Sequence, residues 1–443
     1  MSSIKVEPRE DSLGEWRRTK YTAEVTPLLE GKTITLFGWV AGIRRHGGII
    51  FIIMYDKEGS IQLTVRQDLA SEALVNALDD VSDHSSIGIR GVVKKMDKAP
   101  NGVEIQPIEM KVLAVARKSP PFQLQGTKIP RIDKLLDIRA LALRRPEARA
   151  ILKVRGMTLI KVREFFQKRG YEEVNTPKII ATSTEGGSAL FPLLYYDKEA
   201  FLTQSPQLFK EQLVLSLEKV FEIANAYRAE RSRTLHHLSE FLSLDVEEAF
   251  VDYRDIIRTL EDLMREISSH LHLTCDKELS FLGIKDKGPI AEIPELAYDK
   301  AIEIVRGRDS EIEWGDDFSS QSLGILGKEF PSFYFITDWP AKGKPFYIQS
   351  KGELTESFDL MSGPLEIASG GTRVSSKNEL ETKLTEKGLN PNSFEYHLKV
   401  FDYGMPPHAG FGLGVERLLM ILANQSNVRD VTIFPRDQYR LTP

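Results

Sequence analysis

Apolar and polar residues alternate in short runs over residues 20–116, and this two-residue period is typical of β-strands. Turn-forming sequences separate the runs at Gly47-Gly48, Lys57–Gly59 and Pro100–Gly102. A helical stretch, Asp68–Leu78, interrupts the alternation. The pattern therefore predicts five strands with the helix between the third and the fourth: Thr33–Arg44, Ile49–Tyr55, Ile61–Arg66, Ser86–Met96 and Val103–Ala114.

This order of elements is that of the OB-fold barrel, a common reader of single-stranded nucleic acid. On the open face of such a barrel, Arg44, Phe51 and Gln62 would supply charge, stacking and a base-edge contact. The alternative for Phe51 is a place in the barrel core, which the alternation by itself favours. Residues 1–19 are polar and predict a loosely ordered extension, so that the barrel domain spans 20–116.

Residues 117–145 combine Pro, Arg and Lys with weak periodicity, which is typical of a linker. The second domain, 146–443, opens with a strongly amphipathic helix, Arg149–Arg169, that Gly170 ends. A strand, Tyr171–Ile179, follows and contains Pro177. Proline belongs on the edge of a sheet, so this strand is expected at a domain or subunit boundary.

The rest of the second domain mixes helices and strands without a regular βαβ rhythm. This favours an antiparallel sheet flanked by helices, and hence an α+β fold. Residues 273–340 carry little signal. Elsewhere the pattern predicts a helix opening in QSPQLFKEQL, helices at 253–272, Ser376–Lys387 and Val415–Leu422, and strands at Ala200–Thr203, Phe346–Ser350, Ser357–Leu360 and Leu365–Ala368.

One hairpin concentrates chemically useful side chains. Two apolar strands, Val220–Tyr227 and Phe241–Phe250, flank a loop that carries an arginine, a glutamate and two histidines: Arg228, Glu230, His236 and His237. A guanidinium suits a phosphate, a carboxylate suits an exocyclic amine, and the Phe241 ring suits stacking. The hairpin therefore fits a phosphate-bearing, purine-like ligand, with a solvated charged hairpin as the alternative.

Composition narrows the class of protein. The chain has 443 residues and a net charge of −5, so no global basic field indicates a nucleic-acid partner. Its one cysteine, Cys275, excludes an internal disulfide and makes a thiolate metal site implausible. The charged N-terminus does not predict a signal peptide, and no apolar run approaches the roughly 20 residues of a membrane span. A cytoplasmic location is expected.

Common nucleotide and metal motifs do not account for the hairpin. The G-x-G at residues 412–414 lacks the third glycine of a dinucleotide fingerprint, and the sequence has neither a Walker motif nor H-E-x-x-H. Instead, three features together resemble motifs 1, 2 and 3 of class II aminoacyl-tRNA synthetases. These are the helix with the Pro177 strand, R-x-E at Arg228–Glu230 with Phe241 downstream, and G-x-G-x-E-R at 412–417.

The resemblance covers nearly all of residues 20–443, and the barrel narrows it to the Asp/Asn/Lys subgroup. Length and the RLTP ending are similar to aspartyl enzymes of the archaeal and eukaryotic type. The resemblance implies that a homodimer, assembled through motif 1, activates L-aspartate with ATP and transfers it to tRNA(Asp). The anticodons for Asp and Asn share two letters, so tRNA(Asn) stays open as a second acceptor.

For ATP, the resemblance implies that Arg228 binds the α-phosphate, Glu230 the adenine amine and Phe241 the adenine ring. Arg417 would bind on the γ-phosphate side, and Asp359 and Glu366 would hold Mg²⁺; a carboxylate pair without a metal is the alternative. His236 stands where many relatives carry arginine. The catalytic residues are then Arg228, Glu366 and Arg417, and the ATP-binding set is Arg228, Ala229, Glu230, His236, His237, Leu238, Phe241, Glu366, Gly414, Val415, Glu416 and Arg417.

For the amino acid, the resemblance assigns a basic pocket in which Lys210 and Arg373 face the side-chain carboxylate of the substrate. Asparaginyl enzymes usually lack a lysine at position 210 and carry glutamate at position 245, where this chain has Asp245. The loop Glu230–Thr234 is closer to the asparaginyl form. The implied aspartate-binding set is Glu185, Gln207, Leu208, Phe209, Lys210, Arg228, Asp245, Ser369 and Arg373.

In the barrel, the resemblance makes Phe51 a stacking platform for the anticodon, with Arg44 and Gln62 beside it. The chain departs from the usual R-D-L-G-G at Arg44–Gly48, and the Lys98–Asn101 loop is a candidate for reading the third letter. Three rivals remain open: an asparaginyl-tRNA synthetase, a catalytically decayed RNA-binding paralogue, and an ATP-dependent asparagine synthetase, which would not need an anticodon barrel.

Overall fold

The computed structural model describes residues 10–126, 129–181, 189–231, 234–284, 290, 292–308 and 312–443. The chain divides into two compact units, Met1–Leu135 with Ala140–Arg145, and Leu136–Arg139 with Pro146–Pro443. In the described ranges no helix is both long and apolar enough to cross a membrane.

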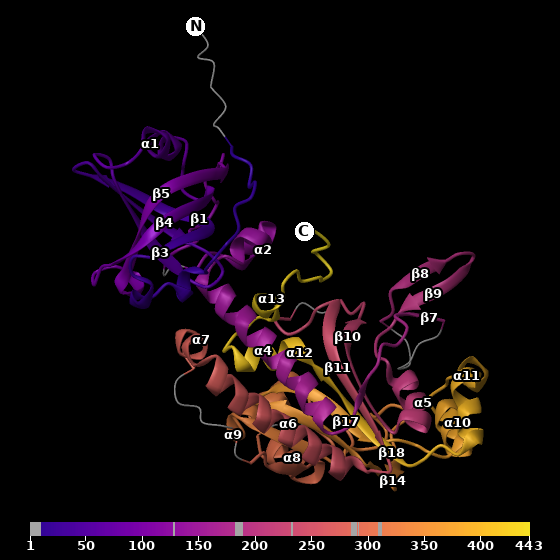
Figure 1. Ribbon diagram of the computed structural model, residues 1–443. Coiled ribbons are helices and arrows are strands. Elements are labelled where there is room, and N and C mark those ends of the chain that lie inside the picture. Colours follow the sequence, from indigo (N-terminus) through magenta and orange to yellow (C-terminus); the bar gives the residue numbers. More distant parts are fainter. Residues whose placement is uncertain are drawn as a thin grey trace. The chain divides into compact units, whose positions relative to one another are not determined.

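The described strands of the first unit close into a barrel in the order β1-β2-β3-β5-β4 (Figure 1). Alternate residues of β2 point inward, and Ile50, Ile52 and Met54 join the barrel core. This confirms the predicted OB-fold order. The elements are β1 Thr33–His46, β2 Ile49–Tyr55, β3 Ser60–Arg66, α1 Glu72–Asp79, β4 Ser86–Lys95 and β5 Val103–Ala114.

The described part of the N-terminal extension is not loosely ordered, and that prediction is wrong for residues 10–19. The main chain of Asp11 donates to Val112, and that of Thr19 donates to Thr35. Trp16 is buried to 9% exposure, and the Arg90 guanidinium lies 4.6 Å from its ring. A large aromatic ring in an otherwise polar segment anchors that segment to the barrel.

The second unit is built on a mostly antiparallel sheet. Eight described strands pair in the order β12-β13-β16-β17-β18-β11-β10-β6, which confirms the α+β prediction. Only the β12–β13 and β6–β10 pairs are parallel. The strands are β6 Glu172–Glu173, β10 Lys219–Tyr227, β11 Glu240–Ala249, β12 Glu295–Ala297, β13 Phe333–Thr337, β16 Ser357–Ser362, β17 Leu365–Thr372 and β18 His408–Gly414.

Helices and two small sheets surround the large sheet. The long helices α4 and α6 pack with the sheet in one core, whereas α5, α10 and α11 contribute to a second core at one end (Figure 1). These helices are α4 Pro146–Lys168, α5 Gln207–Leu217, α6 Tyr253–Thr274, α7 Asp276–Phe281, α8 Tyr298–Arg306, α9 Ser320–Glu329, α10 Lys377–Glu386, α11 Glu395–Leu398, α12 Val415–Leu422 and α13 Val428–Val431; the small sheets contain β7 Ile179–Ile180, β8 Pro192–Tyr195 and β9 Lys198–Leu202, and β14 Ser350–Lys351 and β15 Leu354–Thr355. Two short helices, α2 Ile132–Asp137 and α3 Arg139–Ala142, span the boundary between the two units in the sequence.

Two predicted strands are wrong. Tyr171–Ile179 is not continuous, because Thr176 donates its main-chain N–H and its hydroxyl to the buried Glu222 carboxylate rather than to a neighbouring strand. Pro177 follows in a segment between β6 and β7. Phe346–Ser350 is also mostly irregular, and its first three residues, Phe346, Tyr347 and Ile348, are buried in the α5–α10 core instead.

The centre of the sheet is unusually close-packed. Cβ atoms built on Gly370 and Gly410 would lie 2.5 Å from the Gly410 carbonyl oxygen and 2.1 Å from that of Val246, respectively. Neither position therefore tolerates a side chain. The two glycines allow β17, β18 and β11 to pack tightly beneath the cavity described next.

Candidate functional site

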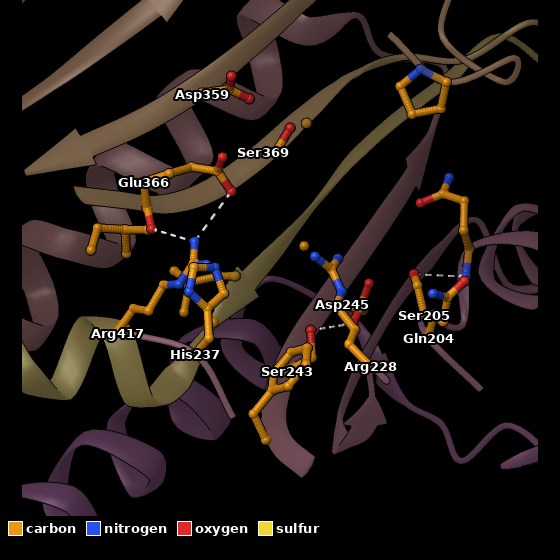
Figure 2. Close-up of a pocket in the computed structure, with 18 of the residues that line it drawn as sticks. Gln204, Ser205, Arg228, His237, Ser243, Asp245, Asp359, Glu366, Ser369 and Arg417 are labelled. Atoms are coloured by element: carbon orange, nitrogen blue, oxygen red, sulfur yellow. Dashed lines mark hydrogen bonds and ion pairs between the residues drawn. The ribbon is translucent and has the colours of Figure 1, made fainter. Parts of the chain in front are cut away.

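A cavity of about 330 Å³ opens over the central strands of the second unit (Figure 2). It is lined by side chains from the β10–β11 connection, β16, β17, β18, the first turns of α5 and α12, and the segment 344–348. The structure brings most of the predicted site residues to this one cavity: Gln207, Arg228, Glu230, His236, His237, Leu238, Phe241, Asp245, Asp359, Glu366, Ser369, Arg373, Gly414, Glu416 and Arg417.

Some predicted residues do not line it. Leu208 is fully buried in the α5–α10 core, and the cavity lining leaves out four others, Ala229, Phe209, Lys210 and Val415. Glu185 lies outside the described residues. The misses at Leu208, Phe209, Lys210 and Val415 share a cause, because neighbours of a site residue along a helix point to other faces.

Two arginines stand at one end of the cavity. The Arg417 guanidinium donates to the main-chain oxygen of Glu366 at 2.9 Å and lies 3.5 Å from its carboxylate and 3.2 Å from Nε2 of His237 (Figure 2). Arg228 lies over the Phe241 ring, 5.7 Å from its centroid, and 3.9 Å from Glu230. Guanidinium groups of this kind bind phosphate oxygens in two-point geometry.

The two histidines of the β10–β11 connection are poor cations. Burial, followed by the positive charge of Arg417, lowers the pKa of both His236 and His237 below the usual histidine value. At neutral pH both rings are therefore uncharged and act as hydrogen-bonding groups. His236 accordingly adds no positive charge to this part of the cavity.

Two carboxylates face the same end of the cavity. Asp359 on β16 is held by Lys344, whose ammonium lies 3.0 and 3.2 Å from its two oxygens. Desolvation, followed by the negative charge of Asp359, raises the pKa of Glu366, although 49% of the Glu366 side chain stays exposed. Crowded carboxylates of this kind favour a hard cation.

The described side chains do not form a complete metal cage. Among the described residues, no group of three or more His, Cys, Asp or Glu side chains is arranged to hold a metal ion. Asp359 and Glu366 nevertheless fit Mg²⁺, which is commonly held by one or two carboxylates and completes its octahedron with phosphate oxygens and water.

The other end of the cavity is less basic than the sequence predicted. Arg373 lines it, but its guanidinium is paired with the buried Glu247 at 2.9 and 3.2 Å. Lys210 lies beneath the cavity, 3.2 Å from Asp245 and 3.4 Å from Glu247, and also donates to two main-chain oxygens. The prediction that Lys210 faces an open pocket is therefore wrong for this conformation, because α5 turns the ammonium toward the sheet.

Sequence reasoning missed several residues of the cavity wall, among them Lys344 and Tyr347. Tyr347 lies in the predicted strand Phe346–Ser350, and Lys344 stands two residues before it. The sequence contained a signal for Lys344, because this lysine stands directly before the proline and aromatic run Pro345–Tyr347 and therefore next to buried rings. Lys344 packs 4.3 Å from the Trp339 ring while it holds Asp359.

The β10–β11 connection is braced from the C-terminal segment. The main chain of Val428 donates to Leu235, and that of Ser239 donates to Arg436. Arg139, which is 4% exposed, donates in turn to four main-chain oxygens of residues 429–433 at 2.6–3.2 Å. Arg139 thus fixes α13 and the strand-like tail that hold the connection.

We expect Arg139→Ala to raise the KM for the ligand at the arginine end roughly tenfold, since the brace of the β10–β11 connection loosens. The KM for the ligand at the Arg373 end should change less than twofold. Steady-state kinetics with each ligand varied in turn checks this. Arg131→Ala, which removes an exposed guanidinium paired with Asp133, is the matched control. Equal changes in both KM values would contradict a local brace.

In the barrel, the predicted nucleic-acid residues lie on the outer face. Arg44 pairs across the ladder with Phe51, and Phe51 with Thr64. Phe51 is half-buried and does not belong to the barrel core, so the core alternative is wrong. Gln62 donates to the buried Glu104 at 3.1 Å. A ring flanked by a cation and amide groups is a suitable platform for an unstacked base.

Comparisons with known proteins agree with this geometry. The model of the family described as tRNA synthetases class II (D, K and N) matches residues 131–438, and that of the OB-fold nucleic acid binding domain matches residues 34–113. The chain therefore belongs to the class II tRNA synthetases of the D, K and N group. As a member of that family it is an ATP-dependent ligase that joins an amino acid to tRNA.

Relatives of similar length show which members of the D, K and N group this chain resembles in sequence. An aspartate–tRNA(Asp/Asn) ligase from Archaeoglobus fulgidus is 42% identical, covering 96% of this chain and 99% of the relative, and one from Saccharolobus solfataricus is 44% identical over 96% and 100%. An aspartate–tRNA(Asp) ligase from Pyrobaculum aerophilum is 42% identical over 96% and 99%. Among solved structures, an asparaginyl-tRNA synthetase from Pyrococcus horikoshii, complexed with asparaginyl-adenylate, is 33% identical with a TM-score of 0.90, covering 96% of this chain and 100% of that one.

Proposed function

We propose that this chain activates L-aspartate with ATP to form aspartyl-adenylate and transfers the aspartyl group to tRNA(Asp). The observation that carries the proposal is the placement of Arg228, Arg417 and Arg373 around one cavity. The names of the archaeal relatives support aspartate as the amino acid.

In this proposal the substrate carboxylate is itself the nucleophile and attacks the α-phosphate while pyrophosphate leaves. The protein positions the two anions and stabilises charge that develops on phosphorus. Arg228 binds the α-phosphate, Arg417 binds the γ-phosphate side, and Phe241 and Glu230 bind the adenine ring and its amine. Gly414 presents main chain, without a side chain, next to Arg417.

Asp359 and Glu366 are the proposed ligands of Mg²⁺. When bound, this ion neutralises charge on the triphosphate. Lys344 holds Asp359 in place and keeps that buried carboxylate paired in the ligand-free protein. The raised pKa of Glu366 fits the same role, because a carboxylate that is costly to ionise gains most from a cation.

Arg373 is the proposed contact of the aspartate side chain, and Asp245 and Ser369 line the same cavity. Lys210 acts indirectly, by holding Asp245 and Glu247. The barrel face around Arg44, Phe51 and Gln62 is the proposed anticodon contact. A homodimer through α4 and the Pro177 segment is supported by exposed apolar residues there, Ile160 at 48% and Ile179 at 47%.

A four-way assay tests the function directly. Purified tRNA(Asp) and tRNA(Asn) are each offered with aspartate and with asparagine, and ATP–pyrophosphate exchange is measured with each amino acid alone. We expect exchange with aspartate and charging of tRNA(Asp). Charging of tRNA(Asn) with aspartate would extend the acceptor range, as the names of the Archaeoglobus and Saccharolobus relatives indicate for those proteins.

Asparagine activation is the second candidate function. It is favoured by one observation: both cations at this end, Lys210 and Arg373, are already paired with carboxylates of the protein. The likeness to the Pyrococcus asparaginyl enzyme is consistent with it. Exchange with asparagine but not with aspartate would replace the first proposal by this one.

A further inference from the structure

A buried cluster of ionisable groups lies beneath the Arg373 end of the cavity. Glu211 on α5 is fully buried, and its Oε2 faces Nε2 of His397 at 3.4 Å and Nε2 of His408 at 3.7 Å. Its other oxygen accepts a hydrogen bond from Gln207, which lines the cavity, at 2.7 Å. Glu211 therefore connects two buried imidazoles to the wall of the amino-acid end.

The charges of the cluster balance only when one of its histidines is protonated. Lys210 and Arg373 are two cations, whereas Asp245, Glu247 and Glu211 are three carboxylates, and all five are at most 4% exposed. One negative charge would remain uncompensated in a dry environment, which is costly. Protonation of one imidazole removes that cost.

Hydrogen bonding indicates which imidazole carries the proton. Nδ1 of His408 lies 2.8 Å from the main-chain oxygen of Pro406, which can only accept, so Nδ1 bears a hydrogen. In the neutral ring, Nε2 would then turn a lone pair toward the Glu211 carboxylate. His397 has the opposite arrangement, because the Gln212 amide lies 3.3 Å from its Nδ1 and can donate there, which leaves an N–H at Nε2 for Glu211 even when the ring is neutral.

We propose that His408 is held as an imidazolium by Glu211 and Pro406, and that its proton sets the charge of the floor of the amino-acid pocket and so favours an anionic side chain. This inference rests on the proposed aspartate specificity. His408 and Glu211 act as positioning and charge-setting residues and touch no substrate. Burial alone lowers the pKa of His408, but the adjacent Glu211 and then Glu247 raise it above the usual value.

Every element packed around His408 contributes to this balance. Glu211 of α5 and Glu247 of β11 are the charged groups that act on its ring, and Arg373 donates its main-chain N–H to the His408 oxygen. The wider cluster contacts these groups or other members of the cluster: Asp245, Gln207, Lys210, Gln212, His397 and Tyr347. The two imidazoles reduce the pKa of Glu211 below its usual value, against the effect of burial, so Glu211 stays ionised.

The sign of the pH dependence follows. Below the raised pKa of His408 the floor is neutral, and above it the floor gains one negative charge and repels the aspartate side chain. We expect the KM for aspartate to rise roughly tenfold between pH 6.5 and pH 9, whereas the KM for ATP stays within twofold. Pyrophosphate exchange with each substrate varied in turn measures both.

Two variants separate this role from a structural one. Glu211→Gln removes the one carboxylate that Lys210 and Arg373 do not balance. The floor is then neutral while His408 is uncharged, and the KM for aspartate should become independent of pH. His397→Gln retains an amide donor toward Glu211 and should keep the wild-type pH profile. Glu218→Gln, on an exposed residue at the end of the same helix, is the matched control and should also keep it.

The outcomes are distinguishable. A flat profile in the wild type, or a Glu211→Gln profile that rises like that of the wild type, overturns the role of His408. A profile that is lost in His397→Gln and kept in Glu211→Gln assigns the proton elsewhere and also overturns it. Absence of aspartate-dependent exchange in the wild type at every pH instead overturns the proposed function.

Discussion

Arg228→Ala is expected to lower kcat/KM for ATP–pyrophosphate exchange by about 10³-fold, because it removes the guanidinium assigned to the reacting phosphorus. The side chain is 40% exposed and lies on the wall of the cavity above Phe241, so its loss should leave the fold intact. Thermal unfolding of the variant should match the wild type. Filter binding should show that tRNA affinity is largely kept.

Two further variants sharpen this test. Arg228→Lys keeps a charge but loses the two-point geometry, so a partial recovery of no more than about tenfold is expected. Arg258→Ala removes an exposed guanidinium from α6 and controls for a general change in charge. Exchange that is unchanged in Arg228→Ala would contradict the role of Arg228 in the reaction.

Arg373→Gln is expected to lower kcat/KM for aspartate by about 10³-fold, since the anionic side chain loses its direct cationic contact. Binding of ATP, measured in the absence of amino acid, should change little. The same substitution also leaves Glu247 with Lys210 as its remaining cation, and breaking a buried pair of this kind costs about 3–5 kcal/mol. Stability and activity are therefore both expected to fall.

The double variant Arg373→Gln with Glu247→Gln separates the two effects. It removes both members of the buried pair, so much of the stability should return, whereas aspartate activation should stay low. Recovery of aspartate activation along with stability would show that Arg373 acts only through the fold.

Much of the fold could be predicted from local patterns. Strand alternation located all five barrel strands, and helical spacing located α12 at Val415–Leu422 to the residue. The failures arose where tertiary contacts replace local ones. Thr176 bonds to Glu222 rather than to a strand neighbour, and Trp16 fixes a polar segment that has no periodicity of its own.

The residues that form the site could be predicted from the sequence, but the ion pairs that they form with one another could not. Sequence motifs brought Arg228, Glu366 and Arg417 together, and all three line the cavity. The pattern could not show that Lys210 on α5 pairs with Asp245 and Glu247, because these carboxylates lie on β11, which meets α5 only after folding. It gave no indication of the Glu211 cluster either, since Glu211, His397 and His408 meet only after folding.

The close strand packing that Gly370 and Gly410 allow restricts the motion of the sheet. Strands that pack this closely cannot slide or bend relative to one another, so the part of the sheet beneath the two substrates is rigid. Adjustment to successive ligands, from free amino acid to adenylate to the end of a tRNA, must then take place at the rim. Among the described residues, the candidate for that motion is the segment 344–348, which carries Lys344.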